Sequence, residues 1–290
     1  YIIGQIYELF LDETLIIQPD GMITAQPKPE IVDAQGTVNT PKNVTDIIVE
    51  ETLKPLYTDK QPEEVSEYRI ADICCGSGNF LLSAFEYIEN YYIEYYRQHE
   101  QEEAERRGMI FRLPGSTNYL LSYEIKRAIL SNNLFGVDID PLAIEVTKFS
   151  LLLRALENST LEEVESYIRQ THNRILPNLD NNVKNGNSLV DTSYEAFNPD
   201  VYRNAALLNK LKLFDWRAEF QNRKFDAIIG NPPYIRVQNM VHYSREEYDF
   251  YKSEYSPYET AGVDTLDKYY LFIEKGLALL NPNGMLGYIV

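Results

Sequence analysis

The chain has 290 residues, 44% of them hydrophobic, so it can bury the core of one large α/β domain, and no run approaches the roughly 18 apolar residues that span a bilayer. Its formal net charge of −17 counts against a nucleic-acid partner, because affinity for DNA depends largely on Lys and Arg contacts to phosphate. The two cysteines are adjacent and there are three histidines, so we predict no structural disulfide, no metal site and a reducing cytoplasm.

Residues 1–40 are expected to form a helical and loop extension, in which residues 2–16 show a loosely helical apolar pattern. Thr40 and Pro41 predict a helix start, with Thr40 as N-cap and Pro41 as the first helical residue. The apolar face of this helix would consist of Val44, Ile47 and Ile48. We expect 41–290 to be one catalytic domain that stops before its last strands, because the chain starts without Met and ends on an apolar run.

Strands and helices alternate along the rest of the chain. Apolar runs predict strands at 69–74, 134–139, 183–190, 225–229 and 285–290. Periodic segments predict helices at 79–107, 124–133, 141–157, 161–171 and 265–280. This alternation indicates a parallel, doubly wound sheet, in which ligands bind at the carboxyl ends of the strands. We therefore expect the segments after four strands to converge on one crevice: 74–79, 138–140, 187–189 and 230–234.

A glycine turn, Gly76-Ser77-Gly78, follows the first of these strands. Glycine lets the backbone approach a ligand closely and adopts φ angles that other residues avoid. Asp72, at the strand end, can neutralise the amino group of a cofactor. A glycine pair also suits a tight turn without a ligand, so this segment alone leaves both interpretations open.

Two acidic residues, Asp138 and Asp140, lie at the end of the strand predicted at 134–139. An acidic side chain at the end of the second strand is the usual device for holding two ribose hydroxyls. Asp140 precedes Pro141 and fits a helix N-cap. We assign the ribose contact to Asp138 and the cap to Asp140.

The sequence Asn231-Pro232-Pro233-Tyr234 comes directly after the buried strand at 225–229. Consecutive prolines fix the backbone in an extended form, which directs the Asn231 amide oxygen and the Pro232 carbonyl at one point. Two acceptors there can bind an exocyclic amine and free its lone pair to attack a methyl group on sulfur, with Tyr234 stacked on the ring. A rigid turn with a packed tyrosine is the alternative interpretation.

These segments resemble the motifs of amino-methyltransferases that use S-adenosylmethionine. Residues 72–80 resemble motif I, 136–141 motif II and 231–234 motif IV. Thr40-Pro41 resembles motif X, whose backbone covers the methionine part of the cofactor, and 186–189 resembles motif III, which holds the cofactor's adenine. Two further segments resemble motifs V and VI: 268–275 and 284–290.

The order of these motifs, with motif X first, is that of the γ class of N6-adenine DNA methyltransferases. Residues 4–8 and 129–138 resemble its type IIG (Eco57I-like) restriction–modification subgroup. The resemblance implies a Rossmann-like class I methyltransferase fold and methylation of adenine flipped out of double-stranded DNA. It also implies a fused nuclease or helicase, with most DNA contacts made by segments missing from this chain.

The resemblance assigns catalysis to Asn231, Pro232, Pro233 and Tyr234. It assigns S-adenosylmethionine binding to Thr40, Asp72, Cys74, Gly76, Gly78, Asp138, Ile139, Asn187, Ser188 and Phe272. Two positions depart from the family pattern, which usually has Asp in place of Asn187 and Ala in place of Cys74. The amide oxygen of Asn187 can still accept a hydrogen bond from the cofactor's adenine N6, but without a charge.

Three alternatives to adenine methylation stay open. An N4-cytosine methyltransferase uses the same amine chemistry, although Ser more often replaces the first Asn there. A protein-glutamine N5-methyltransferase shares Asn-Pro-Pro-Tyr and suits the acidic charge, but normally lacks the motif X helix start and the long 80–135 segment. A catalytically silent scaffold that binds the cofactor is the third, and the intact tetrapeptide at 231–234 argues against it.

Two other patterns are interpreted as structural. Tyr87, Tyr91 and Tyr95 recur every four residues, and a helix face packed on the core explains them better than a base-stacking platform. The segment 124–126, Glu-Ile-Lys, matches half of a nuclease signature but has no suitably spaced acidic partner. We interpret it as a solvated helix.

Overall fold

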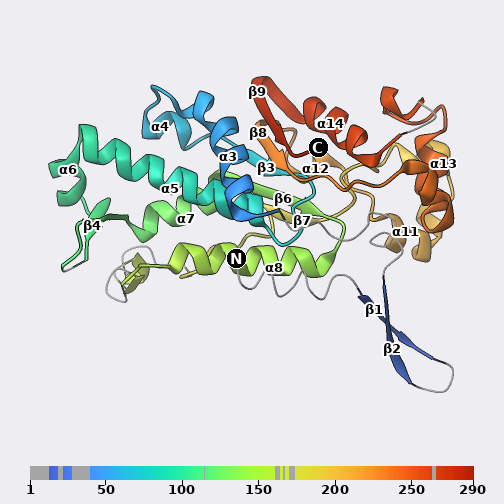
Figure 1. Cartoon of the computed structure of the whole chain (residues 1–290), viewed down its shortest axis with the longest axis horizontal. Helices are drawn as coiled ribbons and strands as arrows, with labels where there is room; N and C mark the ends of the chain where they lie inside the picture. The colour runs from blue at the N-terminus through green and yellow to red at the C-terminus, as the bar shows by residue number, and fades with distance from the viewer. Residues whose placement is uncertain are drawn as a thin grey trace.

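The computed structural model (Figure 1) describes residues 13–18, 22–27, 40–113, 115–160, 164–165, 167–169, 174–262 and 266–290. Its centre is a five-stranded sheet in the order β7-β6-β3-β8-β9, in which every neighbouring pair is parallel. The strands are β3 (Ile70–Asp72), β6 (Leu134–Asp138), β7 (Val183–Asn185), β8 (Phe225–Gly230) and β9 (Leu280–Tyr288). The predicted parallel α/β sheet is confirmed.

Strand order reverses beside β3. The chain runs outward from β3 through β6 to β7, then returns to place β8 on the other side of β3 and ends the sheet with β9. Such a reversal opens a crevice at the carboxyl ends of the two strands that flank it. The segments that follow β3 and β8 are the glycine turn and the Asn-Pro-Pro-Tyr sequence, so the fold brings these two motifs together.

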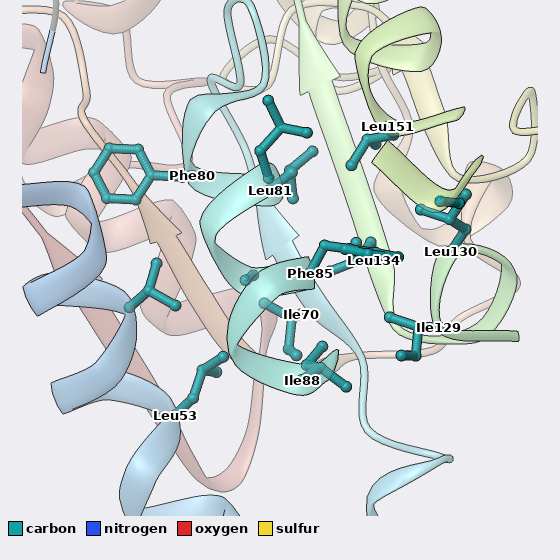
Figure 2. Packing of buried hydrophobic residues seen from close by; sticks show 14 of the residues in the cluster. Leu53, Ile70, Phe80, Leu81, Phe85, Ile88, Ile129, Leu130, Leu134 and Leu151 are labelled. Atoms are coloured by element: carbon teal, nitrogen blue, oxygen red, sulfur yellow. The ribbon is translucent and has the colours of Figure 1, made fainter. Parts of the chain in front are cut away.

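Hydrophobic cores cover both faces of the sheet. On β8, Ala227 and Ile229 join one core and Ile228 the other, as the alternation of side chains along a strand requires. Figure 2 shows Leu81, Phe85 and Ile88 of α5 in the first core, with sheet and neighbouring-helix residues around them. The main helices of the first core are α3 (Lys42–Tyr57), α5 (Asn79–His99), α7 (Tyr123–Asn132) and α8 (Pro141–Leu156).

The second core lies against the later part of the chain. Its helices are α10 (Tyr194–Phe197), α11 (Ala205–Leu211), α12 (Trp216–Glu219), α13 (Arg245–Tyr251) and α14 (Lys268–Leu279), with short 3-10 helices at Val201–Arg203, Val237–His242 and Glu259–Gly262. The remaining elements are α4 (Pro62–Val65), α6 (Gln101–Arg106), and the antiparallel pair β4 (Ile110–Arg112) and β5 (Tyr119–Leu121). Among the described residues, no helix has the length and apolar composition needed to cross a membrane.

Several predicted elements differ in the structure. The helical prediction over 2–16 is wrong at 13–16, because β1 (Glu13–Ile17) pairs with β2 (Ile23–Pro27) in an antiparallel hairpin. The β-branched residues Thr14, Ile16 and Ile17 favour a strand once a partner is present. The remainder of that prediction, 2–12, lies outside the described residues, as does most of the helix predicted over 161–171.

The apolar face predicted for α3 is only partly correct, because Ile48 packs against the first core but Ile47 does not. Ile47 is exposed, and the buried residues are Thr45, Val49, Thr52, Leu53 and Tyr57. A Cβ added to Gly287 of β9 would lie 1.9 Å from Thr52 Oγ1, so the helix and this strand come close only because position 287 has no side chain. Close packing on β9, which the local pattern does not show, therefore decides which face is buried.

The predicted helix at 79–107 is divided at Glu100 into α5 and α6. Its tyrosines pack as predicted: Tyr91 lies edge-on to Tyr57 of α3, with ring centroids 5.0 Å apart. The prediction of a solvated segment at 124–126 is wrong for Lys126, which is buried. Its Nζ donates to the Glu157 carbonyl (2.7 Å) and lies 3.6 Å from Glu89 of α5.

Candidate active site

The reversal in strand order places Asp72 beside the segment that follows β8. Asp72 pairs with Ile229 in the parallel ladder between β3 and β8. A Cβ added to Gly230 would lie 2.8 Å from Asp72 Oδ1, which leaves no room for a side chain there. Glycine at 230 therefore allows the backbone just before Asn231 to pass directly over the Asp72 carboxylate.

The glycine turn after β3 is held by hydrogen bonds to β6 and α8. The Gly76 N–H donates to Asp138 Oδ2 (2.8 Å), and the Thr147 hydroxyl donates to the Gly76 carbonyl (2.8 Å). Gly76 has φ +52° and faces open space, whereas Gly78 has φ +87° and an added Cβ would lie 2.8 Å from Thr147 Cγ2. Gly76 therefore leaves the approach open, and Gly78 is required by its close contact with α8.

Two carboxylates, the buried Asp72 and the half-buried Asp138, lie at the ends of neighbouring strands. Asp72 accepts a hydrogen bond from the Cys74 N–H (3.0 Å), and Asp138 also accepts one from the Asp140 N–H (2.8 Å). Burial, with a smaller contribution from the nearby Asp138 carboxylate, raises the pKa of Asp72 to about 7. Burial also raises the pKa of Asp138. A cation or hydroxyl donors would stabilise this pair of acids.

The assignment of Asp140 to the helix N-cap is confirmed. It is the N-cap of α8, its side chain accepts a hydrogen bond from the Leu142 N–H (2.9 Å), and Pro141 occupies the first helical position. Asp138 instead turns its carboxylate to the glycine loop. Its predicted contact with ribose hydroxyls stays a prediction.

The residues predicted to hold the cofactor's adenine are tied to neighbouring strands. Asn187 is buried, and its Oδ1 accepts a hydrogen bond from the Leu189 N–H (3.1 Å). The Ser188 hydroxyl donates to the Ile73 carbonyl next to Asp72, and Trp216 Nε1 donates to the Ser188 carbonyl (3.0 Å). The segment is therefore rigid. The contact of Asn187 with the N6 of the cofactor's adenine stays a prediction. It is chemically possible, because the Asn187 amide oxygen retains a second lone pair after it accepts the bond from Leu189.

The other predicted cofactor residues differ in exposure. Ile139 is 42% exposed at the end of β6, so its side chain is available to cover a ligand. Phe272 is buried in the second core. Cys74 is half-buried and Cys75 fully buried, and burial raises the pKa of both thiols. Neither thiol is therefore activated as a nucleophile.

The Asn231–Tyr234 segment is tied to two distant parts of the chain. Asn231 Nδ2 donates a hydrogen bond to Thr40 Oγ1 (2.9 Å). Ile289 donates its N–H to the Gly230 carbonyl (3.2 Å) and accepts a hydrogen bond from the Tyr234 hydroxyl (3.0 Å). Contacts at both ends thus fix the position of the segment.

The two proline carbonyls of this segment differ in whether they accept a hydrogen bond. The Pro233 carbonyl accepts a hydrogen bond from the Ile235 N–H (3.1 Å). Within the described part of the chain, no hydrogen bond ends on the Pro232 carbonyl. Pro232 is therefore the proline that can offer its carbonyl to an incoming donor.

A buried ion pair supports the loop that follows. The Val237 N–H donates to the Leu266 carbonyl and the Lys268 N–H to the Ile235 carbonyl, both at 2.7 Å. Lys268 Nζ also lies 3.1 Å from Glu247 Oε2. Burial would raise the pKa of Glu247, but the Lys268 ammonium beside it keeps that pKa below its usual value. The pair joins the start of α14 to α13.

The sequence prediction missed three contacts of this site. Thr40 was predicted as the N-cap of the following helix, but the structure has Pro41 at the N-cap position. No side chain forms a capping hydrogen bond at the start of this helix. The Thr40 hydroxyl is used instead by Asn231, 191 positions away, and no local pattern reveals such a partner. One feature of the sequence could have indicated the Thr147 contact with Gly76: Thr147 is a polar residue in the mainly apolar helix predicted over 141–157. The Ile289 contacts are made by backbone atoms and carried none.

Comparison with known proteins decides the family. A family model described as the Eco57I restriction-modification methylase matches residues 132–290. The type II restriction enzyme and methyltransferase RM.Eco57I of Escherichia coli is 34% identical over 289 residues, which is 100% of this chain and 26% of that protein. The chain belongs to the Eco57I restriction-modification methylase family.

The chain is also similar to parts of two other proteins. The adenine-specific methyltransferase PglX of Streptomyces coelicolor is 24% identical over 213 residues, covering 70% of this chain and 15% of PglX. A solved structure of a nuclease-deletion mutant of the Type ISP restriction-modification enzyme LlaGI with a DNA substrate mimic has a TM-score of 0.47 and 18% identity, over 87% of this chain and 18% of that chain. The chain thus spans about a quarter or less of the length of each of these proteins.

Family membership gives the cofactor as S-adenosylmethionine. The residues present fit this group: the buried Asp72 and the half-buried Asp138 offer carboxylates to an ammonium and to ribose hydroxyls, and Gly76 leaves open space beside them. A Cβ added at Gly76 would project into that space. The negative field of the two acids also favours a cofactor that carries positive charge.

Proposed function

We propose that this chain carries the catalytic site of an enzyme that methylates the N6 amine of adenine in DNA, as the modification part of a restriction–modification enzyme. One observation carries the proposal. Asn231 and the Pro232 carbonyl come directly after β8 at the reversal in strand order, beside Asp72. Two hydrogen-bond acceptors are therefore available next to the predicted cofactor site.

S-adenosylmethionine, when bound, supplies a methyl group on a positively charged sulfur. The Asn231 amide oxygen and the Pro232 carbonyl would each accept a hydrogen bond from the exocyclic amine of adenine. This arrangement draws the nitrogen out of conjugation with the ring and directs its lone pair at the methyl carbon. Methyl transfer would form the nitrogen–carbon bond as the carbon–sulfur bond breaks, leaving S-adenosylhomocysteine, and water would take up the proton that the amine loses. Tyr234 would stack on the base.

DNA is proposed as the substrate because the matched relatives are named as a restriction enzyme and methyltransferase and as an adenine-specific methyltransferase. The negative charge of this chain requires most phosphate contacts to come from elsewhere. Basic side chains after the catalytic segment are already engaged: Arg245 Nε bonds to Asp249 (2.9 Å), and Lys252 Nζ donates to the Ala261 carbonyl (2.8 Å).

The proposed whole protein therefore includes more than this chain. The chain spans 26% of RM.Eco57I, which leaves length for a recognition segment and a fused nuclease or helicase. Within the chain, we propose residues 41–290 as the catalytic domain and residues 1–40 as an extension. A DNA substrate agrees with the cytoplasmic location predicted from the cysteines.

The test is Asn231→Ala in the full-length protein. Transfer of tritiated methyl groups to unmethylated DNA should fall by at least about 10²–10³-fold, the usual loss when one preorganised polar partner is removed. Calorimetry should give an unchanged affinity for S-adenosylhomocysteine, because Asn231 has no assigned cofactor contact. Asn239→Ala, in the 3-10 helix that follows, is the matched control and should methylate at the parent rate. A parent rate in Asn231→Ala would contradict the proposal.

A further inference from the structure

The side chains of Thr40 and Asn231 meet at the candidate active site. Asn231 Nδ2 donates to Thr40 Oγ1 over 2.9 Å, although 191 positions separate the two residues. Thr40 is 8% exposed and directly precedes α3, whereas Asn231 directly follows β8. The bond therefore joins the start of α3 to the first residue of the catalytic segment.

The Thr40 hydroxyl is available for this bond because the helix start does not use it. The N–H groups of Val44 and Thr45 donate to the Pro41 carbonyl (2.9 and 3.1 Å), and no side chain caps the helix. The Thr45 hydroxyl also donates to the Pro41 carbonyl (3.4 Å). The first turn is thus completed by backbone groups, and the Thr40 side chain is directed towards β8.

The position of Thr40 is itself well fixed. Val49 and Leu53 of α3 are buried in the first core, and Leu53 lies beside α5 in Figure 2. Thr52 touches β9 where Gly287 has no side chain. Helix α3 therefore cannot shift relative to β8 and β9 without disturbing the core. A hydroxyl held in this way is a fixed reference point for the amide.

The orientation of the Asn231 amide matters for the proposed chemistry. An amide has a donor end and an acceptor end, and only the oxygen can bind an amine N–H. The opposite orientation would present the NH2 group of Asn231 to the NH2 group of the base, donor against donor. A fixed partner for Nδ2 therefore keeps the oxygen available for the substrate.

We propose that Thr40 is a positioning residue for Asn231, which holds the donor end of its amide so that the oxygen faces the target amine. This inference rests on the proposed function, and it differs from the cofactor contact that motif X implies for the backbone at Thr40. The two roles separate in measurement. A cofactor contact affects the affinity for S-adenosylhomocysteine, whereas a positioning role affects the rate at saturating cofactor.

The test compares Thr40→Ser with Thr40→Ala in the full-length protein. Both variants lose the methyl group and only the serine retains a hydroxyl, so the pair isolates the hydrogen bond. At saturating S-adenosylmethionine, Thr40→Ala should lower kcat for methyl transfer to unmethylated DNA by about 10- to 100-fold, the effect of losing one hydrogen bond to a buried polar group. Thr40→Ser should stay within about threefold of the parent.

Three further readings complete the experiment. Calorimetric affinity for S-adenosylhomocysteine should stay within about twofold in both Thr40 variants. Thr45→Val, a neighbouring buried threonine with a hydroxyl bonded only locally, should retain the parent kcat. Thermal unfolding of the two Thr40 variants should occur at similar temperatures, so that a difference in rate between them cannot come from folding.

The inference is overturned if Thr40→Ala and Thr40→Ser have the same kcat, or if Thr40→Ala loses cofactor affinity while its kcat is unchanged. Failure of the proposed function would be different. In that case the parent protein itself would place no methyl group on DNA adenine, whatever residue stands at position 40.

Discussion

The hydroxyl of Tyr234 donates a hydrogen bond to the backbone carbonyl of Ile289, 3.0 Å away. The ring of Tyr234, which is proposed to stack on the target base, is therefore anchored at its far end. Its centroid lies 6.1 Å from that of Tyr269, in a tilted arrangement. The catalytic segment thus has an aromatic side chain held in place before a base arrives.

Because of this hydrogen bond, two substitutions at Tyr234 should have different effects on the rate of methylation. Tyr234→Phe retains the ring and loses one hydrogen bond, worth about 1 kcal/mol, so kcat for DNA methylation should fall by about fivefold. Tyr234→Ala removes the stacking surface, worth about 1–3 kcal/mol per base, as well as the bond, and should lower kcat by about 100-fold or more. Steady-state rates with unmethylated DNA measure both. Parent activity in Tyr234→Ala would refute the stacking role.

Asp138 and Asp140 allow a matched test of the cofactor site. Asp138→Ala should weaken binding of S-adenosylhomocysteine by about 1–3 kcal/mol, because ribose hydroxyls would lose their partner and the Gly76 N–H its acceptor. Asp140→Ala removes only the cap of α8 and should lower the free energy of unfolding by about 1 kcal/mol without changing the affinity. Calorimetry and denaturant unfolding measure the two effects. Equal affinity in the parent and Asp138→Ala would remove Asp138 from the ribose role.

Cofactor affinity should depend on pH through Asp72. Burial raises the pKa of its carboxyl to about 7, and only the ionised form attracts the cofactor's ammonium. Affinity for S-adenosylhomocysteine should therefore increase as the pH rises from 6 to 8, by up to about tenfold per unit below the pKa. In Asp72→Asn the affinity should be lower and nearly independent of pH over this range. A flat profile in the parent protein would contradict the assignment.

The same raised pKa affects the stability of the cofactor-free protein in the opposite direction. The folded state binds a proton at Asp72 more tightly than the unfolded state, in which the carboxyl has its ordinary pKa of 3.8. The contribution of Asp72 to the free energy of unfolding should therefore decrease as the pH rises from about 4 to about 7. Denaturant titrations of the parent and Asp72→Asn at pH 5 and pH 8 measure this difference.

Gly78 should be the more sensitive of two glycines with positive φ. Gly108→Ala, at φ +67° in open space, should cost about 1–2 kcal/mol of stability from backbone strain alone. Gly78→Ala, at φ +87°, adds a contact of 2.8 Å with Thr147 and should cost about 1–3 kcal/mol more. Urea unfolding compares the two variants, and equal losses would show that the Thr147 contact relaxes easily.

Local sequence was sufficient to predict the alternating strands and the positions of the chemical motifs. Asp140 could be assigned as a helix cap because Pro141 and an apolar helical pattern follow it in the sequence. The strands at 134–139 and 225–229 were predictable because buried parallel strands are continuous apolar runs. The reversal in strand order then explains why motifs far apart in the chain meet.

Contacts between distant segments could not be predicted in this way. Thr40 has the local pattern of a cap, yet its hydroxyl binds Asn231. The local pattern predicts a solvated helix residue at Lys126, yet Lys126 is buried because Glu89 and the Glu157 carbonyl lie near its Nζ. In both cases the partner is supplied by tertiary structure, which a pattern within one helix does not contain.

The central claim is that Asn231 and Pro232 present an adenine amine to S-adenosylmethionine. The most direct measurement is mass spectrometry of the nucleosides released from DNA that the full-length protein has methylated with isotopically labelled cofactor. We expect the label in N6-methyladenine, and its loss in the Asn231→Ala protein. Label in N4-methylcytosine, or in a protein glutamine with none in DNA, would contradict the claim.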